Sequence, residues 1–191
     1  MLNACYGLED MSASIQKPRK LNYDDYAKIP QDGMRHEIID GVHFVNAAPS
    51  TVHQHVSKRL QYQLYTKIEL AGLGVLFNAP VDVQFSEFDV VQPDLVIVLN
   101  ENVRKITPTK IKVAPNLVVE ILSPSTTELD HTLKKELYER FGVQEYWIVD
   151  PFEQSLAQWV LTAGKYLLAP AADPIMLAIV PGISIAQETI W

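Results

Sequence analysis

The sequence predicts an α/β domain in which buried strands alternate with amphipathic helices. Residues 94–99 and 116–122 are apolar runs bounded by polar residues or proline, a pattern typical of strands in the middle of a sheet. Residues 52–68 and 129–141 repeat apolar positions every three or four residues, as amphipathic helices do. Because the 191 residues are 48% hydrophobic and show no internal repeat, we expect one domain over residues 21–191.

Composition and charge limit the possible classes of function. The single Cys5 cannot form an internal disulfide, and the sequence has no apolar run of signal-peptide or membrane-spanning length. These two features lead us to expect a cytoplasmic protein without membrane contact. Residues 1–20 lack periodicity, so we expect a flexible leader there. A net charge of −7 repels nucleic acid, so DNA binding would have to rely on a local basic patch and on bound cations.

The N-terminal part of the domain is predicted to form a short helix and a β-hairpin. Residues 22–26 fit a short capped helix. Strands 35–39 and 42–45 flank Asp40-Gly41, a two-residue hairpin turn signal. Glu37 therefore lies on a strand close to a tight turn.

A long helix is predicted next, beginning at Ser50 and ending near Gly72. Its apolar residues recur every four positions: Val52, Val56, Leu60, Leu64 and Ile68. At about 100° per residue, His53 falls within this apolar arc, whereas His55 points away from it. Residues 81–86 alternate apolar and polar side chains, which predicts a half-buried strand.

The last helix is predicted from a capping box at residues 125–128 to a stop at Gly142. Its apolar arc contains Leu129, Leu133, Leu137, Tyr138 and Phe141. On a helical wheel of about 100° per residue, Asp130, Lys134 and Arg140 fall inside this arc, and Lys135 falls outside it. Beyond it we expect a buried strand at 145–149, a hairpin of 156–161 with 166–169, and a last strand at 175–180.

Two carboxylates are the most informative feature of this pattern. Asp94 begins one buried strand and Glu120 lies inside another, although an ionised group in a sheet interior is costly unless it is compensated. Carboxylates on neighbouring strands repel each other unless they share a cation. The pair is therefore a candidate site for a divalent metal ion.

Structural explanations compete with this interpretation. Asp94 could bond main-chain amides at the start of its strand, and Glu120 could form a buried salt bridge with Lys134. Lys134 could equally pair with Asp130 one helical turn away, and both pairs could exist together. The basic loop at residues 104–112 is either an ordinary solvated loop or a phosphate contact.

Several of these residues together resemble the Uma family. They are Pro93-Asp94, Glu120, Ser123-Pro124-Ser125-Thr126, Lys134, Tyr138 and the run at 142–150. That family, formerly a domain of unknown function, belongs to the PD-(D/E)XK nuclease superfamily. The resemblance covers residues 21 to about 185 and implies a restriction-endonuclease-like fold, a central mixed β-sheet flanked by helices. Hairpins would lie at both ends of the domain.

The resemblance also implies roles for individual residues. Asp94 and Glu120 would hold Mg²⁺, or Mn²⁺ in its place, with the Ile121 carbonyl as a further ligand. Glu37 would have a supporting acidic role, although it could merely pair with a neighbouring cation such as Arg35. His53 matches a histidine that would contact substrate, although a lone histidine on an apolar face is more often a core residue.

The sequence departs from the superfamily pattern at one position. The superfamily places a lysine two residues after the glutamate, on the same face of the strand, but here that residue is Leu122. Lys134 can substitute for it, because the helical wheel directs this side chain inward from the next helix. The arrangement resembles that of the Uma family, whose lysine lies on that helix. Lys134 would then orient the attacking water.

These observations predict a Mg²⁺-dependent endonuclease that hydrolyses phosphodiester bonds in DNA, with Glu37, Asp94, Glu120 and Lys134 as catalytic residues. One such site cuts one strand, so a duplex cut would need a homodimer. The alternative is a catalytically silent module of the same fold that binds protein or nucleic acid.

Overall fold

A six-stranded sheet forms the centre of the computed structural model, which describes residues 19–124 and 127–191. Its strands follow the order β10-β9-β8-β7-β6-β3. Their bounds are Gly74–Asn78 (β3), Leu95–Leu99 (β6), Leu117–Ile121 (β7), Glu145–Asp150 (β8), Ser155–Thr162 (β9) and Lys165–Leu168 (β10). Only β7 and β8 pair in parallel, and the other neighbours are antiparallel, so the sheet is mixed.

The two-residue period of the strands divides their side chains between two cores. Leu95 and Ile97 of β6 pack in one core, while Val96 and Val98 pack in the other. Because both faces are covered, β6 and β7 are buried at every position, which explains their uninterrupted apolar sequence. Glu120 shares its face of β7 with Val118, which belongs to the second core.

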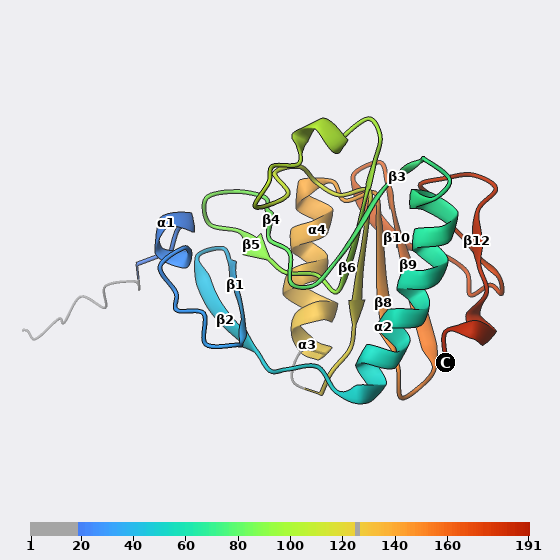
Figure 1. The fold of residues 1–191 in the computed structure, drawn as a ribbon, viewed down its shortest axis with the longest axis horizontal. Helices are drawn as coiled ribbons and strands as arrows, with labels where there is room; N and C mark the ends of the chain where they lie inside the picture. Colours follow the sequence, from blue (N-terminus) through green and yellow to red (C-terminus); the bar gives the residue numbers. More distant parts are fainter. Residues whose placement is uncertain (1–18, 125–126) are drawn as a thin grey trace, which may run out of the picture.

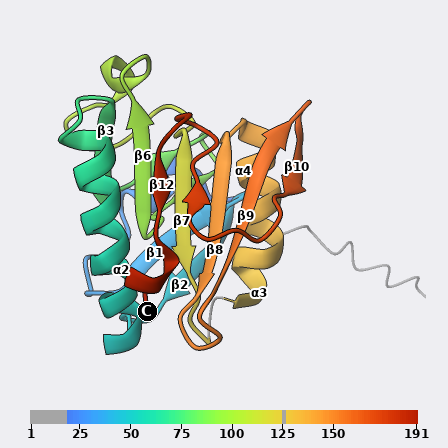
Figure 2. The same ribbon diagram turned by 90° about the vertical axis from the view of Figure 1, so that its right-hand side faces the viewer.

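The first face is covered by α2 (Thr51–Leu64), the π-helix η1 (Tyr65–Glu69) and the C-terminal segment. That segment contains β11 (Ile175–Met176) and β12 (Ser184–Ile185), which pair with each other, and the 3₁₀ helix η4 (Gln187–Thr189). In Figure 2, β12 crosses in front of the sheet while α4 lies behind it. No helix among the described residues is long and apolar enough to cross a membrane.

The second face is covered by the helix that follows β7. This helix contains α3 (Thr127–Leu129), a π-helical stretch η3 (Asp130–Lys134) and α4 (Lys135–Phe141), and it ends at Gly142 with φ of 80°. The predicted stop is thus confirmed, while residues 125–126 of the predicted capping box lie outside the described residues. The wheel was wrong for Leu133, which is 42% exposed, and for Arg140, which is also exposed. A π turn changes the angular step per residue, so a wheel of constant step cannot hold across it.

A four-stranded sheet, β2-β1-β5-β4, lies beside this helix (Figure 1). It contains β1 (Arg35–Ile39), β2 (Val42–Asn46), β4 (Val83–Gln84) and β5 (Val90–Val91), and the short helix α1 (Tyr23–Tyr26) precedes it. The predicted Asp40-Gly41 turn is confirmed, with φ of 49° and 75°. Asp89 accepts hydrogen bonds from the Asp40 N–H at 2.9 Å and from Arg140 at 3.1 Å, so it ties the hairpin to α4.

Two predicted strands are shorter than expected. The strand expected at 81–86 is reduced to β4, because the main-chain N–H groups of Phe85 and Ser86 turn to the Asp89 carbonyl. The last strand, expected at 175–180, is reduced to β11. The N–H groups of Ala178 and Ile179 donate to the buried carboxylate of Glu145 instead of to a neighbouring strand. Residues 1–18 of the expected leader lie outside the described residues.

We expect Glu145→Gln to lower the free energy of unfolding by about 2–3 kcal/mol. One Glu145 oxygen accepts from Trp147 and Gln158, and the other accepts from Ala178 and Ile179. Either orientation of a glutamine amide therefore sets its NH₂ group against two donors. Urea unfolding measures the change, and the exposed Glu153→Gln, with the same loss of charge, should cost less than about 0.5 kcal/mol. Equal midpoints for both variants would contradict this role of Glu145.

Candidate active site

Three of the predicted residues, Glu37, Glu120 and Lys134, are in contact, and Asp94 lies beside Glu120, although the four are far apart in the sequence. Asp94 directly precedes β6, Glu120 lies on β7, Glu37 lies on β1, and Lys134 ends η3. Leu95 of β6 pairs with Val119 of the antiparallel strand β7, so the next residue along each strand, Asp94 and Glu120, lie beside each other. All four side chains are buried, with 4% or less of each residue exposed.

Lys134 lies at the centre of this cluster. Its ammonium nitrogen is 3.1 Å from Glu120 Oε1, 3.1 Å from Glu37 Oε2 and 3.4 Å from Asp130 Oδ1. Burial opposes the charge, but the carboxylates of Glu120, Glu37 and Asp130 outweigh it and hold the pKa of Lys134 above its ordinary value. Both pairs considered from the sequence, with Glu120 and with Asp130, are thus present together.

Asp94 is held from both sides of its carboxylate. Arg35 Nη1 donates to Oδ1 at 2.8 Å, while Oδ2 accepts the Ile121 N–H at 2.8 Å and lies 2.9 Å from His53 Nε2. Burial alone would raise the pKa of Asp94, but the contacts with His53, Arg35 and the Ile121 N–H lower it. His53, the third residue of α2, thus contacts Asp94 and is not simply an apolar-core residue.

Glu37 has polar partners of its own. The Asn46 side chain donates to Oε2 at 2.7 Å, and the Gln92 N–H donates to Oε1 at 2.7 Å. Its cation is Lys134, while Arg35, the alternative partner from sequence, bonds to Asp94. Sequence reasoning missed Arg35 as a site residue, although its alternation with Glu37 on one strand puts both side chains on the same face.

The cluster contains more negative than positive charge. Four buried carboxylates, those of Glu37, Asp94, Glu120 and Asp130, face the cations Lys134 and Arg35 and the imidazole of His53. Burial raises the pKa of Glu120 above its ordinary value. Lys134 opposes the rise, and the charges of Asp130, Asp94 and Glu37 add to it. A further positive charge would therefore be accommodated beside Glu120.

The donor set suits a hard divalent cation. Asp94 and Glu120 offer carboxylate oxygens, the ligands that Mg²⁺ prefers, and Mg²⁺ commonly takes only one or two protein carboxylates. Within residues 19–124 and 127–191, no group of three or more His, Cys, Asp or Glu side chains is arranged to hold a metal ion. Water, substrate or main-chain oxygens would then complete the coordination of a cation at Asp94 and Glu120.

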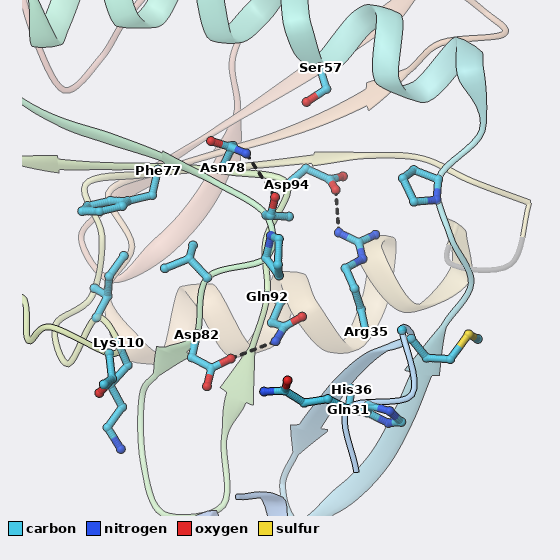
Figure 3. Close-up of a pocket in the computed structure, with 18 of the residues that line it drawn as sticks. Gln31, Arg35, His36, Ser57, Phe77, Asn78, Asp82, Gln92, Asp94 and Lys110 are labelled. Atoms are coloured by element: carbon cyan, nitrogen blue, oxygen red, sulfur yellow. Dashed lines mark hydrogen bonds and ion pairs between the residues drawn. The ribbon is translucent and has the colours of Figure 1, made fainter. Parts of the chain in front are cut away.

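A groove with a volume of about 1460 Å³ leads to Asp94 (Figure 3). Its walls come from residues 23–36, residues 51–61 of α2, residues 77–82 and the loop at 106–111. Arg35, Lys58 and Lys110 bring positive charge to its lining, and the Lys110 ammonium lies 3.2 Å from the centre of the Tyr23 ring. Asp94, Arg35 and His53 line the groove, whereas Glu37, Glu120 and Lys134 are not among its lining residues.

The chain matches a known family model over residues 23–188, described as "Uma2: Putative restriction endonuclease". The protein belongs to the Uma2 family. A search of curated proteins finds no match to this Uma2 chain.

Among solved structures, the Uma2 chain is similar to "a putative nuclease belonging to DUF820" from Anabaena variabilis, with a TM-score of 0.74. The two are 17% identical over 89% of this chain and 97% of the other, so the likeness shows a shared fold. The restriction-endonuclease-like fold predicted from the sequence is thereby confirmed.

The Uma2 structure also separates the two neighbouring lysines. Lys134 is 2% exposed within the cluster, whereas Lys135 is partly exposed, with its ammonium 3.2 Å from the centre of the Trp159 ring. Leu122, at the superfamily's lysine position, packs in the second core. The position two residues beyond Glu120 thus serves packing, and the ammonium comes from the next helix.

We expect Glu120 to make the cation-free Uma2 protein less stable as pH rises from about 5.5 to about 8. The pKa of Glu120 in the folded protein lies above its unfolded value of 4.5. The stability that protonated Glu120 contributes is therefore fully present below pH 4.5 and is lost as pH rises through the folded pKa. Glu120→Gln should remove roughly 1–2 kcal/mol of this decline. Urea unfolding in a chelator at both pH values measures it, with Glu153→Gln as a control that keeps the wild-type slope. A wild-type slope in Glu120→Gln would contradict the expectation.

Proposed function

We propose that this protein is a Mg²⁺-dependent endonuclease that hydrolyses phosphodiester bonds in DNA. The observation that carries the proposal is the position of the Lys134 ammonium, 3.1 Å from both Glu37 and Glu120, with Asp94 beside Glu120 in the lining of the groove. Two carboxylates on adjacent strands with a lysine beside them form a set of groups suited to metal-dependent phosphodiester hydrolysis. Membership of a family described as "Putative restriction endonuclease" supports the same reaction.

Asp94 and Glu120 would hold the cation, with the Ile121 carbonyl as a candidate third ligand. The Ile121 N–H already donates to Asp94, which keeps this strand end against the carboxylate. When bound, the divalent cation would polarise the phosphate and lower the pKa of a coordinated water.

Lys134 would orient the attacking water and stabilise developing negative charge. Its own carboxylate partners prevent it from losing its proton, since they hold its pKa above the ordinary value. Lys134 therefore acts as a fixed ammonium donor. Glu37, which also accepts from Asn46 and Gln92, would keep that ammonium in place and bind a supporting water.

The groove is the proposed path of the nucleic acid. Lys58 on α2 and Lys110 in the loop at 106–111 offer phosphate contacts in a molecule whose net charge is −7. His53 lines the same groove and would contact substrate beside Asp94. We further propose a cytoplasmic homodimer, because two copies of a single-strand-cutting site are needed to cut a duplex.

The purified protein should convert supercoiled plasmid to nicked or linear DNA in Mg²⁺ or Mn²⁺, and a chelator should stop the reaction. Asp94→Ala, purified in the same way, should lower the rate by at least about 10², and it controls for a contaminating nuclease. Cleavage that persists in Asp94→Ala would refute the site. The absence of cleavage by the wild-type protein would favour the silent module.

Lys134→Ala should lower the cleavage rate by about 10² or more, the usual scale for losing a positioned proton-transfer or charge-stabilising group. Lys134→Arg retains the charge among the carboxylates but not the position of the nitrogen, so it should fold and still cleave slowly. Lys135→Ala, one residue further along, should change the rate little. Equal rates for the Lys134 and Lys135 variants would refute the assignment, and thermal midpoints measured alongside separate catalysis from folding.

Mg²⁺ or Mn²⁺ should raise the thermal midpoint by about 5–10 °C at a concentration near 100 times Kd, because the cation binds only the folded state. Glu120→Gln should abolish this shift while leaving the metal-free midpoint unchanged or higher, since it relieves repulsion among crowded carboxylates. Differential scanning calorimetry with and without the cation tests both statements. A full shift in Glu120→Gln would remove Glu120 from the cation site.

A further inference from the structure

The two oxygens of the Asp94 carboxylate are bonded in different ways. Oδ2 is held by the Ile121 N–H and contacts His53, so two partners fix it. Oδ1 has a hydrogen bond from Arg35 Nη1 at 2.8 Å. Losing Arg35 would therefore leave the carboxylate anchored through Oδ2 and would free Oδ1 for another positive partner.

Arg35 is also better able to move than Lys134. The Arg35 side chain is 20% exposed and lines the groove, whereas the Lys134 side chain is 3% exposed behind it. Arg35 Nε is buried and has no hydrogen-bond partner among the described residues. A guanidinium with an unused donor favours a second arrangement in which more of its N–H groups are bonded.

The groove supplies a place for that second arrangement. Figure 3 shows Arg35 extending from β1 to Asp94, with its guanidinium among the residues that line the groove. A guanidinium binds a phosphate through two parallel N–H bonds, which suits it to a nucleic-acid backbone in this groove. A divalent cation on Asp94 would at the same time repel the guanidinium at short range.

We propose that Arg35 exchanges between two partners. In the cation-free protein it neutralises Asp94, and when a divalent cation occupies Asp94 it turns into the groove and pairs with the substrate phosphate. This inference rests on the proposed function, because it requires both a cation at Asp94 and a nucleic-acid substrate. Arg35 is thus the partner of Asp94 before the cation binds. It also contacts the substrate, although it lies outside the predicted catalytic set.

The exchange predicts two opposite effects of one substitution. Arg35→Gln should bind Mn²⁺ alone about tenfold more tightly than the wild type, because the cation no longer displaces a guanidinium. The same variant should cleave DNA at least about 10² times more slowly at saturating Mn²⁺, because the phosphate contact is lost. A residue with only a structural role would not tighten cation binding. Titration calorimetry with Mn²⁺ and plasmid cleavage measure the two effects.

Lys58→Gln is the matched control, since it removes one positive charge from the same groove without a bond to Asp94. Its Mn²⁺ affinity should stay within about twofold of wild type. Arg35→Lys, which keeps a charge at this position and protects the fold, should bind Mn²⁺ with intermediate affinity and cleave slowly.

The outcomes distinguish this inference from the proposed function. Wild-type protein that binds no Mn²⁺ would overturn both. Wild-type protein that binds Mn²⁺, with an Arg35→Gln variant that binds it no more tightly, would overturn the exchange alone. Equal tightening in Lys58→Gln would also overturn it, because general groove charge would then explain the effect.

Discussion

The buried ammonium of Lys134 is the interaction on which the rest of the structure depends. It contacts Glu37 of the small sheet, Glu120 of the central sheet and Asp130 of its own helix, so three parts of the fold meet at one cation. Removing this ammonium would cost about 3–5 kcal/mol, because the buried carboxylates around it would lose their compensating charge. The position of the small sheet against the helix is therefore coupled to the position of the proposed catalytic nitrogen.

Each carboxylate proposed as a metal ligand has its own positive partner without the metal. Asp94 is neutralised at the groove by Arg35, and Glu120 is bonded behind it by Lys134 and by the Tyr138 hydroxyl at 2.6 Å. This division explains how a carboxylate cluster can be folded before any cation arrives. It also gives the two cations different tasks, since the buried Lys134 is fixed and the half-buried Arg35 borders the groove.

The parts of the fold that depend on local sequence were predictable. The apolar runs around β6 and β7, the Asp40-Gly41 turn and the Gly142 stop follow from neighbouring residues, and the structure contains all of them. The Arg35–Asp94 pair joins residues 59 positions apart, and Glu145 removes residues 178–179 from a strand through bonds across 33 and 34 positions. Such contacts depend on the tertiary arrangement, which no local pattern encodes.

The displaced lysine shows how one site geometry can arise from a different sequence spacing. With Leu122 packed in the core, the strand no longer presents an ammonium beside Glu120. Asp130 and Lys134, one helical turn apart in η3, both lie on the buried side as the regular helical spacing predicted, and the lysine reaches Glu120 from this adjacent helix. A π-helical stretch within an α-helix is often found at a functional site. The distance between the charged atoms is thus a better guide to this chemistry than the interval between residues in the sequence.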